Sequence, residues 1–183
     1  MNHICPNNYF TKWVEAEPLA NIRDMDAKRF IWRNIVIRFG VPHTLILDND
    51  LQFDSIVFWR YYRELGIRNG YSTPTYPQGN GQAEATNKVI VARLKKRLDD
   101  AKGKWVDELP HILWTYCTTP RRSTGETLFS MTYGSKSIIS LESGFPTLRT
   151  DQFNVKENHN LLLDSLDLVE ERQKVAMVKM AYY

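Results

Sequence analysis

Two carboxylates occupy positions from which they could bind a divalent cation. Asp48 ends the short apolar run TLILD, and Glu84 falls in the first turn of a helix expected over residues 83–101. Between them lie the 35 residues 49–83. Carboxylates that converge from a strand end and a helix start bind hard cations through oxygen. Paired cations of this kind activate the attacking oxygen and stabilise the leaving oxygen in phosphoryl transfer.

Each of the two acids also has a purely structural explanation. An Asp at a strand end often caps the following turn or helix. An acid at a helix N-terminus is favoured by the helix macrodipole. The spacing of Asp48 and Glu84 therefore means little without the surrounding residues.

The helix that carries Glu84 adds neighbours suited to an anionic substrate. At 100° per residue its core stripe consists of Ala83, Ile90, Leu94, Leu98 and Ala101. Glu84, Lys88 and Lys95 cluster beside this stripe, and Asn87 lies at its edge. A carboxylate next to two ammonium groups and an amide suits an anionic substrate held near a metal.

The elements expected before this helix alternate between strands and helices. Tyr9–Glu17 alternates and is rich in aromatic and β-branched residues, which predicts a half-buried strand. Residues 26–39 repeat apolar positions at helical spacing until Gly40. TLILD is typical of a buried parallel strand. A helix over about 55–65 and a short strand in 67–72 follow.

The second half of the chain is expected to be mainly helical. Two prolines and two glycines make residues 73–82 a loop, after which the 83–101 helix begins. Residues 105–119 are helical in pattern, and an amphipathic helix is expected within 161–183. Strands interleaved with helices indicate an α/β layered fold.

Composition sets wider limits on the class of protein. The 183 residues fit one domain, or one domain and a short appendage, and 43% of them are hydrophobic, enough for a sizeable core. The net charge of +3 is compatible with nucleic-acid binding. Two cysteines exclude a disulfide framework, and the histidines lack zinc-ligand spacing. Without a signal peptide or an apolar run of roughly 18–20 residues, we expect a soluble, intracellular protein with no membrane partner.

Several longer motifs resemble one known family, in the same order. They are NYFTKWVEAEPLA, RFGVPHTLILDN, DNDLQF, YPQGNGQAEATNK, ELPHILWTYCTTPRRSTGETLF and MTYG. Together they resemble the integrase catalytic core of gypsy-type LTR retrotransposons, a retroviral-type integrase. The resemblance runs from about Asn8 to Gly134, which is most of the chain.

The resemblance implies a ribonuclease-H-like mixed sheet flanked by helices. It divides the chain into an integrase catalytic core, residues 8–140, and a linker with the start of a C-terminal helix, residues 141–183. Such cores bind two Mg²⁺ (or Mn²⁺) ions through an Asp, Asp and Glu triad with a 35-residue gap before the Glu. They process the 3′ ends of element DNA and join them to target DNA in the nucleus. Similar cores dimerise, which leaves a homodimer as an open alternative.

Carried over position by position, the resemblance gives roles to individual residues. Asp48 is the second acid and Glu84 the third, and both would be metal ligands. Asn87 and Lys88 would contact element DNA, and Asn80 and Gln82 belong to the mobile loop covering the site. Lys95, which helix geometry puts beside Glu84 and Lys88, completes the expected nucleic-acid-binding set.

The position of the first acid departs from the family pattern, because it is Asn8. Pro6 cannot donate a ladder hydrogen bond, so the strand leading to this position is expected to be degraded or missing. No other Asp precedes Asp24, and capping explains Asp24 and Asp26 at a helix start. With two negative charges in place of three, Mg²⁺ binding should suffer. We therefore expect weak or absent strand transfer.

Two lesser departures lie near the other motifs, and two alternative functions stay open. Tyr76 stands where the family usually has His, and Asp50 where it usually has Gly. The chain could instead be a catalytically silent DNA-binding or dimerising module, or a polyprotein fragment with a truncated N-terminus. Salt-dependent DNA binding without metal-dependent cleavage would favour the silent module.

Overall fold

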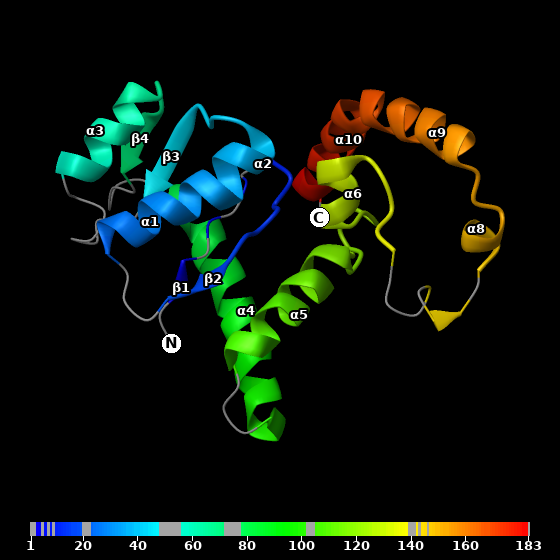
Figure 1. Ribbon diagram of the computed structural model, residues 1–183, viewed down its shortest axis with the longest axis horizontal. Helices are drawn as coiled ribbons and strands as arrows, with labels where there is room; N and C mark the ends of the chain where they lie inside the picture. The colour runs from blue at the N-terminus through cyan, green and yellow to red at the C-terminus, as the bar shows by residue number, and fades with distance from the viewer. Residues whose placement is uncertain are drawn as a thin grey trace. The chain divides into compact units, whose positions relative to one another are not determined.

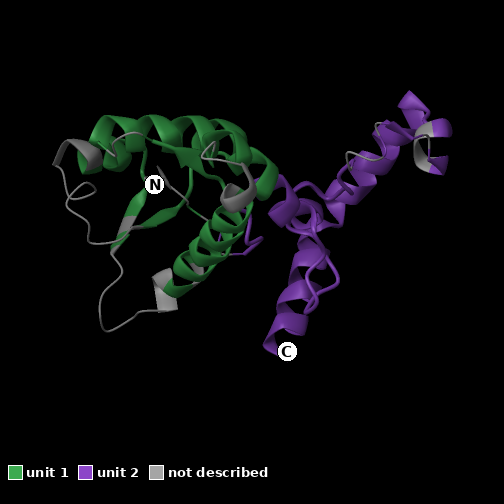
Figure 2. Ribbon diagram, turned by 90° about the horizontal axis from the view of Figure 1, so that it is seen from below, with its two compact units in different colours: residues 1–7, 14–112 green, residues 8–13, 113–183 purple. Residues whose placement is uncertain are grey.

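The computed structural model describes most of the chain, in two compact units. The described residues are 3–4, 6, 8, 10–19, 23–47, 56–71, 78–101, 105–138, 142, 144–145 and 147–182. Unit 1 comprises Met1–Asn7 and Val14–Ile112, and unit 2 comprises Asn8–Trp13 and Leu113–Tyr183 (Figure 2).

Unit 1 begins its helical part with one continuous ribbon made of three segments (Figure 1). These are α1 (Asp24–Ile31), the π-helical η1 (Trp32–Val36) and α2 (Ile37–Phe39). Gly40 follows with φ +84°, a conformation that glycine adopts without steric cost. The predicted helix over 26–39 and its end at Gly40 are therefore confirmed. The acids do not cap it: no side chain caps its N-terminus, and Asp26 instead pairs with Arg23 at 3.0 Å.

The strands of unit 1 form two pairs in the described ranges. β1 (His3–Ile4) pairs antiparallel with β2 (Glu17–Pro18), and β3 (Thr44–Leu47) pairs parallel with β4 (Arg68–Tyr71). The predicted parallel strand before Asp48 and the strand in 67–72 are thus confirmed. The expected burial of β3 is wrong for the side chains described, because Thr44 and Ile46 are exposed and only Leu45 packs against the core. The predicted mixed sheet is represented, within the residues described, by these two separate pairs.

The strand predicted over Tyr9–Glu17 is wrong for most of its length. Phe10 and Thr11 form a turn, Lys12 has φ +60°, and among the described residues 10–17 Val14 makes an isolated bridge and Glu17 alone lies in a strand. The alternating pattern gives way because the side chain of Asn8 hydrogen-bonds to the backbone ahead of it. Such local bonds offer the backbone an alternative to a strand ladder.

The core of unit 1 joins α1 to the α3–β4 segment. Its fully buried members are Ala27, Phe30, Ile31, Tyr62 and Ile67. α3 (Ile56–Glu64) contributes the tyrosine, and Leu45 of β3 packs against the cluster. Burying apolar side chains of this size stabilises a fold by roughly 1.5–3 kcal/mol each. The cluster therefore fixes the strand pair β3–β4 against α1 and α3.

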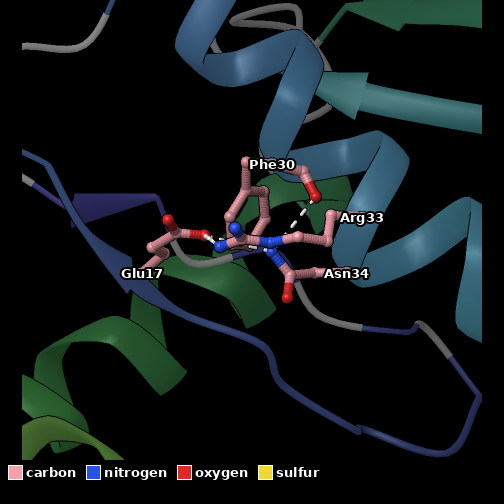
Figure 3. Close-up of polar contacts among 4 residues, drawn as sticks. All are labelled: Glu17, Phe30, Arg33 and Asn34. Atoms are coloured by element: carbon pink, nitrogen blue, oxygen red, sulfur yellow. Dashed lines mark hydrogen bonds and ion pairs between the residues drawn. The ribbon is translucent and has the colours of Figure 1, made fainter.

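Polar contacts tie β2 to the π-helical turn (Figure 3). The carboxylate of Glu17 accepts from Arg33 Nη2 at 2.8 Å and from Asn34 Nδ2 at 3.2 Å. Asn34 also donates to the carbonyl oxygen of Phe30 at 3.2 Å. One carboxylate thus holds two donors from adjacent helical residues, which fixes the short β1–β2 pair against the helix.

The regular secondary structure described in unit 2 is helical. It contains the end of α5 (Trp105–Thr118), then α6 (Leu128–Tyr133), α8 (Leu148–Asp151), α9 (Val155–Asp167) and α10 (Val169–Ala181). The single amphipathic helix predicted within 161–183 is therefore two helices, which meet at Leu168. No described helix is long and apolar enough to cross a membrane.

Unit 2 is held together by α6 and its neighbours. A capping box between Thr127 and Ser130 starts α6. From α10, Arg172 donates to the carbonyl oxygen of Gly134 at 2.9 Å, and Gln173 donates to that of Met131 at 2.7 Å. The C-terminal end of α6 is therefore tied to α10 through its carbonyl groups.

Candidate metal and nucleic-acid site

The strand β3 leads directly to the first candidate acid. β3 ends at Leu47, the residue before Asp48, and pairs in parallel register with Tyr71 at the end of β4. Sites in α/β proteins gather where parallel strands end. Asp48 itself, with Asp50 and Tyr76, lies outside the described residues.

The second candidate acid lies on a helix that contacts this strand. α4 (Gln78–Ala101) contacts β3, and Glu84 is exposed on α4. α4 starts five residues earlier than predicted, so Glu84 is its seventh residue and not part of its first turn. The macrodipole falls off within the first turn. That structural explanation for Glu84 is therefore weaker than the sequence indicated.

The early start of α4 also corrects part of the predicted loop. Gln78–Gln82, which include Asn80 and Gln82, are helical. Gly79 and Gly81 cost a helix roughly 1 kcal/mol each relative to alanine. Burial of the inner face further along α4 offsets that cost. Of Asn80 and Gln82 only the backbone is described.

The predicted division of α4 into two faces is confirmed for the side chains described. Ile90 and Leu94 are buried, with 1% and 3% of their surfaces exposed. Thr86, which the stripe omitted, is also buried. Lys88 and Lys95 are exposed on the same helix as Glu84. The ammonium groups are thus accessible to an anionic ligand.

One ion pair holds α4 to the next helix. Arg97 Nη1 donates to Glu108 Oε2 of α5 at 2.6 Å. Arg97 lies 13 residues after Glu84, which at 100° per residue puts it on the opposite side of α4, and this contact gives that face a partner. Exposed pairs of this kind contribute about 1 kcal/mol or less.

Asn8, which the sequence resemblance matches to the family's first acid, forms a turn. Its side-chain oxygen Oδ1 accepts from the backbone N–H groups of Phe10 and Thr11, each at 2.9 Å. Its backbone N–H donates to Trp13 O at 2.8 Å, and its carbonyl oxygen accepts from Lys12 N at 2.9 Å. The side-chain oxygen Oδ1 has two lone pairs, and the N–H groups of Phe10 and Thr11 engage both of them. The sequence signal for this turn was the Asn itself, a frequent turn former.

The donor set fits a divalent cation only in part. Glu84 supplies carboxylate oxygens of the kind that Mg²⁺ prefers. Asn8 supplies an uncharged oxygen that is already hydrogen-bonded. Within the described residues, no three His, Cys, Asp or Glu side chains are grouped as metal ligands. Asn8 belongs to unit 2 and Glu84 to unit 1.

Comparison with known sequences relates the chain to retroelement polyproteins. It is 34% identical over 145 residues to the Gag-Pol polyprotein of gibbon ape leukemia virus, covering 79% of this chain and 8% of the polyprotein. It is 25% identical over 174 residues to the transposon Tf2-3 polyprotein of Schizosaccharomyces pombe, covering 94% of this chain and 12% of the polyprotein. The chain therefore spans only a small part of these relatives. No protein-family model matches it.

Comparison with solved structures defines the fold class. A chain of the simian T-cell lymphotropic virus intasome, solved in complex with PP2A regulatory subunit B56 gamma, matches with a TM-score of 0.63 and 22% identity, covering 70% of this chain and 46% of that chain. The HTLV-2 integrase catalytic core domain in complex with magnesium matches with a TM-score of 0.57 and 17% identity, covering 70% of this chain and 90% of that chain.

The fold is therefore that of an integrase catalytic core. Together with the polyprotein relatives, this fold relates the chain to the integrase cores of LTR retroelements.

Proposed function

We propose that the chain is the catalytic-core domain of a gypsy-type LTR retrotransposon integrase in which strand transfer is weak or lost. Its reaction would be 3′-end processing and joining of element DNA to target DNA by metal-dependent transesterification. The polyprotein relatives and the integrase-core fold support the reaction class. The observation that carries the impairment is the engagement of Asn8 Oδ1 by two backbone donors.

The proposed metal ligands are Asp48 and Glu84, with Mg²⁺ or Mn²⁺ as the cation. The contact between α4 and β3 supports this pair, because β3 ends beside Asp48 in sequence and α4 carries Glu84. The magnesium complex of the HTLV-2 core supports the choice of cation. When bound, such cations activate the attacking oxygen and stabilise the leaving one.

The remaining proposed residues act on DNA. Lys88 and Lys95 are exposed and would contact phosphates of the element ends, with Asn87 beside them. Asn80 and Gln82 would lie near the substrate from the first turns of α4. Their contacts would hold the scissile phosphate close to Glu84.

The impairment follows from charge. A site with two carboxylates binds a pair of doubly charged ions less strongly than one with three. An amide oxygen supplies no charge and cannot bridge two cations as an anion. Because the oxygen of Asn8 also terminates a turn, its recruitment to a metal would release two backbone N–H groups.

A catalytically silent DNA-binding or dimerising module is the second candidate function. The same turn at Asn8 favours it, since the turn gives residue 8 a structural role without any metal. In either case we propose residues 8–140 as the core, residues 141–183 as linker and C-terminal helix, and the nucleus as the place of action. The solved HTLV-2 cores, one dimeric and one trimeric, support a homo-oligomer.

One experiment separates the two candidates. The purified chain is mixed with labelled paired-end oligonucleotide duplexes in Mg²⁺ or in Mn²⁺, and both DNA binding and joined product are measured. The impaired integrase yields slight joined product that disappears in the Glu84→Gln variant. A silent module binds DNA and gives no product that Glu84→Gln alters. Joining as fast as that of an integrase with a complete triad would refute the impairment.

A further inference from the structure

An open hollow lies in unit 1 at the turn between α3 and β4. It has a volume of about 480 Å³ and is lined by Trp59, Arg63, Gly66, Ile67 and Arg68. Ile67 is buried and anchors the turn in the core. None of these residues belongs to α4 or to the proposed metal ligands. The α3–β4 hollow is thus a separate surface feature.

The two arginines of the hollow lack carboxylate partners among the described residues. Arg63 and Arg68 are exposed and form no ion pair there. Four other arginines of unit 1 each pair with a carboxylate, at 2.6–3.0 Å; they are Arg23, Arg33, Arg38 and Arg97. Arg60, also exposed, lies one helical turn before Arg63. The guanidinium groups at the hollow are therefore available to an external anion.

The aromatic wall of the hollow is held by the core. Trp59 packs edge-on against Tyr62, with ring centroids 6.3 Å apart and planes at 65°. Tyr62 has none of its surface exposed, so the indole of Trp59 rests on a fixed neighbour. An indole supported in this way offers a flat apolar surface to a sugar or base at little entropic cost.

Gly66 adds backbone without a side chain to the lining of the hollow. Gly66 has φ +74°, and a Cβ placed there would meet no atom within 4 Å. A ligand can therefore come close to the main chain at Gly66, which lies between Arg63 and Arg68 in the sequence. Two guanidinium groups that line the same hollow as an accessible backbone suit the oxygen atoms of phosphate, which arginine binds bidentately.

We propose that the α3–β4 hollow binds the sugar-phosphate backbone of DNA, with Arg63 and Arg68 on phosphates and Trp59 against a sugar or base. This rests on the proposed function for DNA as the partner, and it adds a contact surface apart from the Glu84 helix. DNA is favoured over an acidic protein segment because DNA combines regularly spaced phosphates with the flat rings of its bases. Arginines and an aromatic wall complement both features.

The test is the salt dependence of binding to a labelled 30-base-pair duplex of random sequence, in EDTA, between 50 and 200 mM NaCl. The variant Arg63→Gln/Arg68→Gln removes two phosphate contacts and should lower the slope of log K against log salt by about 1.8. Over this fourfold rise in salt, its affinity should therefore fall about tenfold less than that of the parent. The control Arg29→Gln/Arg122→Gln, which removes two exposed arginines outside the hollow, should keep the parent slope.

A second variant shows whether the Gln substitutions act through the lost charges or through misfolding. Arg63→Lys/Arg68→Lys keeps both charges and should retain the parent slope, with lower affinity. An unchanged slope in the Gln variant overturns the inference while leaving the proposed function standing. Loss of polyglutamate binding in that variant, with DNA binding unaltered, overturns it in favour of an acidic protein. A parent chain that binds no duplex refutes both the inference and the proposed DNA partner.

Discussion

The side-chain oxygen of Asn8 accepts a hydrogen bond from the backbone N–H of Thr11 at 2.9 Å. A second bond of equal length comes from Phe10, so the oxygen organises the turn that replaces the predicted strand. The residue that the sequence resemblance matches to a metal-binding acid thus shapes the local backbone here.

Replacing Asn8 by Ala should destabilise the chain by about 1 kcal/mol, because two backbone donors lose their acceptor. Asn8→Asp should retain parent stability, since a carboxylate accepts the same bonds. The free energy of unfolding in urea measures both. Equal stability of the Ala and Asp variants would show that the turn does not depend on this side chain.

Tyr62 should make the stability of unit 1 fall at alkaline pH. Burial, with a smaller contribution from Tyr61, raises the pKa of the Tyr62 phenol above its ordinary value of 10. Above pH 10 the unfolded chain loses this proton before the folded one, so stability present below pH 10 is lost at up to about 1.4 kcal/mol per pH unit. Urea unfolding from pH 9 to 11 should show a shallower loss for Tyr62→Phe. Parallel curves would contradict the prediction.

Gly134→Ala should destabilise unit 2 by about 2 kcal/mol or more. Gly134 has φ +71°, and an added Cβ would lie 2.7 Å from Val169 Cγ2 and 2.8 Å from the carbonyl oxygen of Ser165. Gly125→Ala is the matched control, because Gly125 has φ +76° but open space around the Cβ position. A similar fall in melting temperature for both would leave only backbone strain as the cause.

Gly81→Ala should stabilise α4 by up to about 1 kcal/mol, because Gly81 is helical and a Cβ there meets nothing within 4 Å. The melting temperature should rise, and amide exchange should slow in the first turns of α4. Slower exchange at the control position Lys95, without any change near Gly81, would contradict a local effect.

The sequence predicted those elements that a single local pattern of residues determines. The apolar run ending at Leu47, the Gly40 stop and the buried stripe with Ile90 and Leu94 all follow from local periodicity. The start of α4 was missed because two glycines and two prolines outweighed the packing of the helix further on. The break at Leu168 had no glycine or proline to mark it.

Long-range packing explains the remaining difference. Trp13 packs edge-on against Tyr133, with ring centroids 5.3 Å apart, across 120 residues of sequence. The pair belongs to unit 2, which therefore includes Asn8–Trp13 as well as the C-terminal half of the chain. Alternating apolar residues in 9–17 fit this packing as well as they fit a strand. No local rule distinguishes the two.

The sequence predicted the residue types of the candidate site better than the local conformation around them. Residue types and spacing indicated Asp48 and Glu84, and the exposure of Glu84, Lys88 and Lys95 agrees with a surface open to a ligand. The role of Asn8 as a turn former was missed, since its two acceptor bonds depend on the conformation of the following residues.

If one missing charge at residue 8 limits strand transfer, as we propose, then Asn8→Asp should rescue it. Joined product is measured in Mg²⁺ for the parent, Asn8→Asp, Asn8→Asp with Pro6→Val to restore a backbone donor, and Asn8→Asp/Glu84→Gln. We expect the rate of joining to rise about 100-fold or more in Asn8→Asp, since metal stabilisation is worth several kcal/mol. No such rise is expected in Asn8→Asp/Glu84→Gln. Strong joining by the parent, unaffected by Asn8→Asp, would contradict the proposal.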